Sequence, residues 1–184
     1  NTFEGGAIVC PDAKTKQRID HLKNFGFVDE VTVVASGING KMSELNAAFG
    51  LLQLKHVDVA LERRKEIDQT YRTGLKGVKG VMCLNGDLDA KTNYAYFPIL
   101  INADYPISRD ALYQKLKGHK VYARRYFYPL ISSFPMYRSM PSARSDNLPV
   151  ASRAAEQVLC LPIYPALNAE DQQRIINIIC EVQS

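Results

Sequence analysis

The sequence of 184 residues predicts an α/β protein in two parts. A continuous apolar run, "GAIVC" at residues 6–10, is typical of a strand buried on both faces, as in a parallel sheet. A long amphipathic segment over residues 57–75 follows, and beyond it short apolar runs alternate with segments of helical period. We therefore divide the chain into residues 1–56, a β–α piece, and residues 57–184, a bridging helix with a compact unit of short strands and helices.

The first part is expected to leave its strand at Pro11 and continue as a helix over residues 13–24, which Gly26 ends. Residues 28–40, "VDEVTVVASGING", show no clear period, so they predict an extended excursion or a loop.

Two helices are predicted next. Ser43 is a suitable N-cap for a helix that reaches Leu54, and Glu44 places a negative charge in its first turn, where it complements the helix dipole. The helix over residues 57–75 carries the charged run "ERRKE", which is typical of a solvated outer face.

The second part alternates strands with helices, and its loop "NGDLDAKTN" at residues 85–93 is rich in turn residues. Strands are expected in "GVMCL" (80–84) and "YAYFPILI" (94–101), and "KVYARRYFYPL" (120–130) is expected to be a strand that leads into a loop. Helices are expected in residues 108–119 and 168–183, and residues 146–165 are expected to form a helix followed by a short strand.

Particular residues mark the limits of these elements. Pro98 favours an edge strand or a bulge, because proline lacks the N–H that a central strand uses. Ser108 is expected to cap its helix and Gly118 to close it. Asn168 is the expected cap of the last helix, whose first turn is acidic.

Composition and residue spacing exclude several function classes. The net charge of +4 comes from basic residues spread along the chain, which argues against a nucleic-acid partner. No run approaches 18 apolar residues, so we expect no membrane span. The cysteines form no CxxC pair and lie in apolar runs, which is typical of reduced, buried thiols in a cytoplasmic protein without a metal site. They are Cys10, Cys83, Cys160 and Cys180.

The loop "SGINGKM" is the first candidate site. Its glycines let backbone N–H groups approach an anion, Asn39 offers two amide donors, and Lys41 offers a cation, so the loop suits phosphate recognition. The alternative is an ordinary turn in which Asn39 and Gly40 supply positive φ angles and Lys41 faces water. The residues alone leave both interpretations open.

The segment "YARRYFYPL" at residues 122–130 is the second candidate. Paired arginines can grip a diphosphate, and tyrosines can flank a sugar or a base. In a strand, aromatic and basic residues would share both faces, whereas a core strand has one apolar face, so the functional and the structural interpretations stay open. One face would carry Tyr122, Arg124, Tyr126 and Tyr128, and the other Ala123, Arg125 and Phe127.

Four ordered patterns resemble the DegT/DnrJ/EryC1/StrS sugar aminotransferase family, which uses pyridoxal phosphate. They are "NTFEGGAIV" with "LKNFG", "GINGKMSELNAAFGLLQL" with "RRKEIDQTYRTGL", "VYARRYFYPL", and "LCLPIYPALNAEDQQRI". The resemblance covers essentially the whole chain and is nearest to members that aminate nucleotide-linked keto-deoxyhexoses. It implies the C-terminal portion of a type I pyridoxal-phosphate fold, namely the end of the large-domain sheet and the small α/β domain.

The resemblance also implies roles for particular residues. The Schiff-base lysine of the family would fall just before Asn1, so no catalytic residue is expected in this chain. Asn39 would contact the cofactor phosphate of the partner subunit in a homodimer, and the helix that follows would help to form the dimer contact. Substrate-side residues would be Lys41, Arg124, Arg125 and Tyr126, although Arg125 stands where histidine is common in the family.

The implied function is transfer of the amino group of glutamate to a nucleotide-linked keto-deoxysugar, by a cytoplasmic enzyme. A side branch of the family has histidine in place of the lysine and performs dehydration, which is one alternative. A non-catalytic binding or assembly domain is another. The residue upstream of Asn1 would decide between transamination and dehydration.

Overall fold

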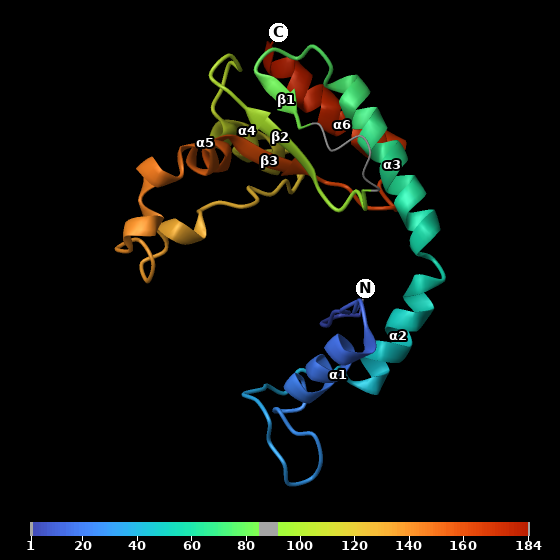
Figure 1. The fold of residues 1–184 in the computed structure, drawn as a ribbon. Coiled ribbons are helices and arrows are strands. Elements are labelled where there is room, and N and C mark those ends of the chain that lie inside the picture. The colour runs from blue at the N-terminus through green and yellow to red at the C-terminus, as the bar shows by residue number, and fades with distance from the viewer. Residues whose placement is uncertain (1, 85–91, 184) are drawn as a thin grey trace. The chain divides into compact units, whose positions relative to one another are not determined.

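A computed structural model describes residues 2–84 and 92–183 of the chain, which form two compact units, Asn1–Asp58 and Val59–Ser184 (Figure 1). Most of the loop predicted over residues 85–93 lies outside the described residues. Among the described residues, no helix is both long enough and apolar enough to cross a membrane.

The first unit contains two helices, α1 (Ala13–Leu22) and α2 (Glu44–Leu54). Helix α1 ends at Leu22, two residues earlier than predicted, and Lys23 is its C-cap residue. The predicted cap of α2 is confirmed, because the Ser43 hydroxyl accepts a hydrogen bond of 3.2 Å from the backbone N–H of Asn46.

The strand predicted at residues 6–10 is wrong for this structure. These residues have no regular secondary structure, and most are exposed, Val9 by 96%. A strand buried on both faces needs strands beside it and helices over it, and the described residues of the first unit supply no strand that pairs with this run.

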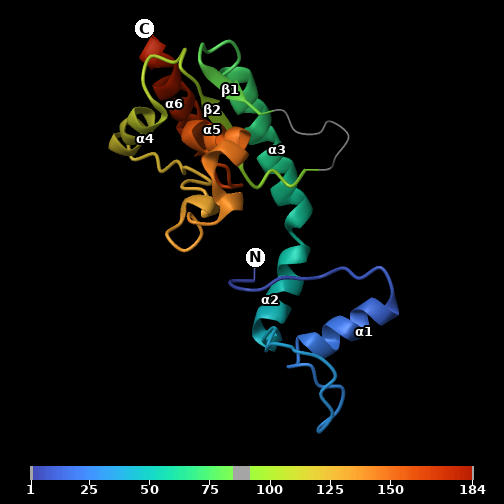
Figure 2. The same ribbon diagram turned by 60° about the vertical axis from the view of Figure 1, so that its left-hand side comes forward.

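The second unit is built on a three-stranded antiparallel sheet in the order β1–β2–β3, with helices gathered around it (Figures 1 and 2). Its strands are β1 (Val81–Cys83), β2 (Phe97–Ile101) and β3 (Val158–Leu161), and its helices are α3 (Val57–Gly74), α4 (Arg109–Gly118), α5 (Pro149–Gln157) and α6 (Ala169–Cys180). The strands predicted in residues 80–84 and 94–101, the short strand after α5 and the three helices predicted beyond residue 107 are therefore confirmed.

Alternation along the strands divides the apolar side chains between two clusters. Ile99 and Leu159 join the main core with residues of α3, α4 and α6, whereas Leu100, Val158 and Cys160 form a small cluster against Tyr126. The main core is the larger of the two, and the small cluster places the sheet directly behind the second candidate segment.

Pro98 does not lie in an edge strand, because β2 is central. The position is nevertheless locally an edge. Cys160, opposite Pro98, directs its backbone hydrogen bonds to Arg124, and β1 ends at Cys83, which pairs with Ile99. The backbone nitrogen of Pro98 therefore points toward β1, not toward β3. Because β1 ends before it reaches the position opposite Pro98, no hydrogen bond between strands is lost.

The strand predicted to lead into a loop within residues 120–130 is confirmed only in part. It contributes one antiparallel bridge, Arg124 to Cys160, and then turns away. Val121 and Ala123 are buried as a strand pattern requires, but the alternation ends beyond Arg124. The segment is a short addition to the edge of β3 that leads into a loop.

Helix caps in the second unit follow the sequence. Ser108 accepts a hydrogen bond from the backbone N–H of Ala111 at 3.2 Å, and Asn168 accepts one from Asp171 at 2.7 Å. The four cysteines are free, but only Cys160 is buried, so the prediction of four buried thiols is wrong for the other three. Cys83 and Cys180 are partly buried against the main core, and Cys10 ends the largely exposed run at residues 6–10.

Two buried tyrosines each join a helix to a loop. The Tyr71 hydroxyl donates to the carbonyl of Pro162 at 2.9 Å, and the Tyr105 hydroxyl donates to the carbonyl of Ile179 at 2.7 Å. Burial raises the pKa of Tyr105 to about 12, with a smaller contribution from Cys180, and burial also raises the pKa of Tyr71.

These raised pKa values predict an alkaline loss of stability. The unfolded state ionises Tyr105 near its ordinary pKa of 10.0, whereas the folded state keeps it neutral to about 12, so its contribution is complete below pH 10 and is lost as the pH rises to about 12. We expect Tyr105→Phe to lower the free energy of unfolding at pH 7 by about 1 kcal/mol, through the lost hydrogen bond, and to flatten its dependence on pH between 10 and 12. Urea unfolding at a series of pH values measures both, and an unchanged slope in the variant would contradict the prediction.

Candidate functional site

The loop that carries Asn39 is held by the end of helix α1. The backbone N–H of Ile38 donates to the carbonyl of Leu22, and that of Gly40 donates to the carbonyl of Lys23, both at 2.9 Å. Asn39 itself forms an antiparallel bridge with Asn24. Its backbone is therefore fixed on both sides, while the residue remains exposed.

Two glycines allow this loop to lie so close to the helix end. A Cβ atom on Gly37 would lie 2.5 Å from the carbonyl oxygen of Leu22 and 2.6 Å from the carbonyl carbon of Phe25, and it would also meet the backbone nitrogen of Gly26. Gly26 has φ of +86° and is buried. Glycine at both positions is thus a condition for the observed path of the loop.

Lys41 lies against the same helix end. Its Nζ donates to Asn24 Oδ1 at 3.0 Å and is 5.4 Å from the centre of the Phe25 ring. An ammonium group has three donors, and one is used here among the described contacts, so Lys41 can still meet an anion. Asn39 and Lys41 both lie on the loop that packs against the end of α1.

The second candidate segment begins at the sheet. Arg124 exchanges backbone hydrogen bonds with Cys160, of 2.9 and 2.7 Å, which place it beside β3 at the edge of the sheet, and the residue is exposed. Its Nη1 donates to the Tyr126 hydroxyl at 2.7 Å. Burial raises the pKa of the Cys160 thiol, which therefore stays protonated behind this segment.

Arg125 has different surroundings from its neighbour. Its Nη1 donates to Asp110 Oδ1 at 2.9 Å, and its guanidinium lies 4.6 Å from the ring centre of Tyr113 and 5.7 Å from that of Tyr128. The guanidinium of Arg109 lies 4.8 Å from the Tyr128 ring as well. Sequence reasoning missed Asp110, Tyr113 and Arg109, because an acidic residue after a serine cap has the ordinary signature of a helix start.

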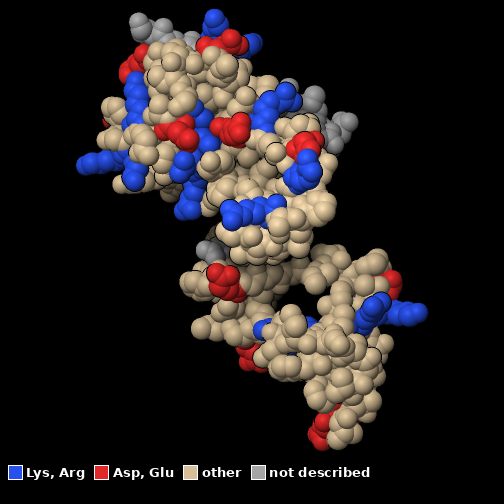
Figure 3. Space-filling model, turned by 90° about the vertical axis from the view of Figure 1, so that its left-hand side faces the viewer, with Lys and Arg blue, Asp and Glu red and all other residues tan. Residues whose placement is uncertain are grey.

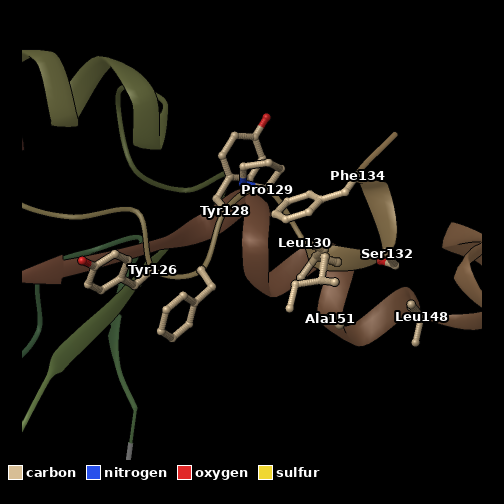
Figure 4. Close-up of a pocket in the computed structure, with 10 residues that line it drawn as sticks. Tyr126, Tyr128, Pro129, Leu130, Ser132, Phe134, Leu148 and Ala151 are labelled. Atoms are coloured by element: carbon tan, nitrogen blue, oxygen red, sulfur yellow. The ribbon is translucent and has the colours of Figure 1, made fainter. Parts of the chain in front are cut away.

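Two cavities meet at Tyr126 and Tyr128. One, of about 470 Å³, has a mixed polar and apolar lining that includes both arginines, and the other, of about 600 Å³, is mainly apolar. Figure 4 shows the second, with Tyr126 beside the strands and with Leu148 and Ala151 belonging to the region of α5. On the face of the second unit seen in Figure 3, basic side chains are interspersed with acidic ones. An anionic group with an apolar or aromatic appendage suits this pair of cavities.

Comparison with known proteins identifies related chains. Residues 1–180 match the model of the DegT/DnrJ/EryC1/StrS aminotransferase family. The chain is 56% identical, over 96% of its length and 48% of the relative, to a dTDP-4-amino-4,6-dideoxy-D-glucose transaminase of Escherichia coli. It is 44% identical to a protein of the same name from Shigella dysenteriae, over 100% of this chain and 49% of that one. The chain thus spans about half the length of the curated relatives it matches.

Solved structures of related proteins are also similar to this chain. DesI, described in the presence of its TDP-sugar product, superposes with a TM-score of 0.88 and 35% identity, over 98% of this chain and 46% of that one. DesV of S. venezuelae, in complex with a ketimine intermediate, gives a TM-score of 0.85 and 26% identity, over 94% of this chain and 45% of that one. These matches confirm the expected fold class, the C-terminal portion of a sugar aminotransferase. The chain belongs to the DegT/DnrJ/EryC1/StrS aminotransferase family.

Proposed function

We propose that the chain forms the C-terminal half of a pyridoxal-phosphate-dependent transaminase, which moves the amino group of glutamate to a dTDP-linked 4-keto-6-deoxysugar. The observation that carries this proposal is the 56% identity, across 96% of the chain, to a transaminase named for a dTDP-linked 4-amino sugar. As the resemblance implies, the Schiff-base lysine would precede Asn1. The free state of the four cysteines supports a cytoplasmic location.

Asn39 is the residue we propose for the cofactor phosphate. An exposed side-chain amide, on a backbone fixed at both flanking residues, can donate to a phosphate without further ordering of the loop. The cation of Lys41 on the same loop adds favourable charge, so the donor set fits a phosphate group. Pyridoxal phosphate, when bound, supplies the electron sink for amino-group transfer.

The segment from Arg124 to Tyr126 is proposed for the substrate side, together with Lys41. Arg124 projects an exposed guanidinium with several donors, which suits the diphosphate of a nucleotide sugar. Tyr126 lines both cavities and offers a ring face and a hydroxyl. Arg125 lies between them in the same segment.

Helix α2 supports a homodimer. It is apolar along most of its length, yet none of its residues is buried, and Leu45 is 77% exposed. Leu51, Leu52 and Leu54 are exposed as well. A helix that is apolar on all sides is normally covered, so we propose that α2 contributes to the contact between subunits.

The proposal is tested with the complete enzyme, dTDP-4-keto-6-deoxy-D-glucose and ¹⁵N-labelled glutamate. We expect the label to appear on the sugar as a 4-amino group, and a GDP-linked sugar with the same ring to be a poorer substrate. Loss of water from the sugar without transfer of the label would indicate the dehydratase branch. Absence of both reactions and of cofactor binding would indicate an assembly domain.

A further inference from the structure

Arg124 and Arg125 are adjacent in the second candidate segment, but their side chains have different environments. Arg124 is exposed, and its described side-chain contacts are within its own segment, to the ring and hydroxyl of Tyr126. Arg125 is half-buried, and it contacts one carboxylate and two aromatic rings. Because the N–H groups of this guanidinium bind a carboxylate and its planar faces lie against aromatic rings, it is poorly placed to contact a ligand as well.

The carboxylate that holds Arg125 belongs to Asp110, in the first turn of α4. That turn is itself well fixed. Ser108 caps it, and Leu112 and Leu116 anchor the helix in the main core. Asp110 therefore gives Arg125 a partner on a rigid element, 15 residues away in the sequence.

Arg109 lies near the same carboxylate and the same aromatic ring as Arg125, those of Asp110 and Tyr128. It is 5% exposed, and its Nη1 donates to the carbonyls of Ala155 and Val158, each at 3.0 Å. Its Nε lies 2.9 Å from Asp110 Oδ1, in a direction that makes an ion pair without a hydrogen bond. Since its guanidinium also faces Tyr128, the ring of Tyr128 lies near two arginines that share one carboxylate.

We infer that Asp110 is a positioning residue: by holding Arg125, and with Arg109 the ring of Tyr128, it fixes residues 124–128 so that Arg124 and Tyr126 face the nucleotide sugar. The inference rests on the proposed function and deepens it. It assigns Arg125 to the support of the site, and leaves Arg124 as the arginine that contacts substrate.

The expected effect lies in substrate binding. Asp110 is 58% exposed in its side chain, so its ion pairs alone add little to stability. Releasing Arg125, however, frees a segment that must be ordered again when the substrate binds. Asp110→Asn and Arg125→Gln should therefore each raise the KM for the nucleotide sugar by roughly threefold to tenfold, with kcat and the KM for glutamate nearly unchanged.

A double-mutant cycle in the complete enzyme tests this inference. If Asp110 acts through Arg125, the double variant binds no more weakly than the weaker single variant, and Asp110→Glu retains part of the affinity. Lys41→Ala is the matched control, because Lys41 is proposed for the substrate side but lies outside residues 124–128, so its effect should multiply with that of Asp110→Asn. Multiplicative effects of Asp110→Asn and Arg125→Gln, or tighter binding after Asp110→Asn, would overturn the inference.

Equilibrium binding of dTDP, measured by calorimetry, separates this test from the proposed function. The same cycle in dTDP affinity should show the same coupling, whether or not the enzyme transfers an amino group. Thermal unfolding of each variant checks that it is folded. Wild-type protein that binds dTDP but does not transaminate would refute the function alone, whereas uncoupled dTDP affinities would refute the positioning role alone.

Discussion

Replacement of Asn39 by alanine is expected to weaken retention of pyridoxal phosphate in the complete enzyme by roughly 10- to 100-fold. A hydrogen bond from an amide to a charged group contributes about 1.5–3 kcal/mol, and alanine removes the donors without disturbing the backbone bonds of Ile38 and Gly40 that hold the loop. Titration of the apoenzyme with the cofactor measures the loss. Asn39→Asp should be weaker still, because it places a carboxylate against the phosphate.

Mixing of subunits tests whether Asn39 serves the cofactor of its neighbour. Asn39→Ala is combined with a second variant in which the Schiff-base lysine is replaced. If the asparagine reaches across the dimer, a mixed dimer contains one site with both an intact lysine and an intact Asn39, so activity returns. If Asn39 serves its own subunit, neither site is complete, and at a cofactor concentration too low to fill the Asn39→Ala site the mixture gains no activity. Cofactor affinity in Asn39→Ala equal to that of the wild type would remove the residue from the site altogether.

The helix starts of this protein could be predicted because their causes are local. Ser43, Ser108 and Asn168 each accept a hydrogen bond from a backbone N–H three residues later, so the pattern of a few neighbouring residues determines the cap. The apolar periods of α3 and α6 likewise needed no knowledge of their partners.

The errors concern features whose cause lies elsewhere in the chain or outside the described residues. The apolar run at residues 6–10 has strand character, but a strand forms only beside another, and none pairs with it here. Proline is tolerated in a strand where no backbone N–H is needed for pairing. Pro98 meets this condition although β2 is the central strand, because β1 is too short to pair with it.

The candidate site also combines features that could be predicted from neighbouring residues with features that could not. Asn39 and Lys41 are close in sequence, so one loop brings them together. The difference between Arg124 and Arg125 could not be predicted, because it depends on where the core places α4 and therefore Asp110. Period alone assigned the two arginines to opposite faces, and it could not say which face would meet a carboxylate.

Gly37→Ala is expected to weaken cofactor retention at least as much as Asn39→Ala, although it removes no polar group. Its Cβ would lie 2.5 Å from the carbonyl oxygen of Leu22 and 2.6 Å from the carbonyl carbon of Phe25, and backbone atoms cannot rotate aside as a side chain can. The loop must therefore move away from the end of α1, and the hydrogen bond from Ile38 to Leu22 breaks. Asn39 then loses the fixed backbone from which it donates, and we expect roughly a tenfold or greater loss of affinity.

Gly40→Ala is the matched control in the same loop. Its Cβ would be 3.3 Å from the Cβ of Lys23, a contact that a small adjustment relieves, so cofactor affinity should change by less than about threefold. The double variant Gly37→Ala with Asn39→Ala should bind no more weakly than Gly37→Ala alone, since a displaced Asn39 has no contact left to lose. If Gly37→Ala binds the cofactor as the wild type does while Asn39→Ala does not, the asparagine acts from a mobile loop, and the close packing of Gly37 on Gly26 serves the fold alone.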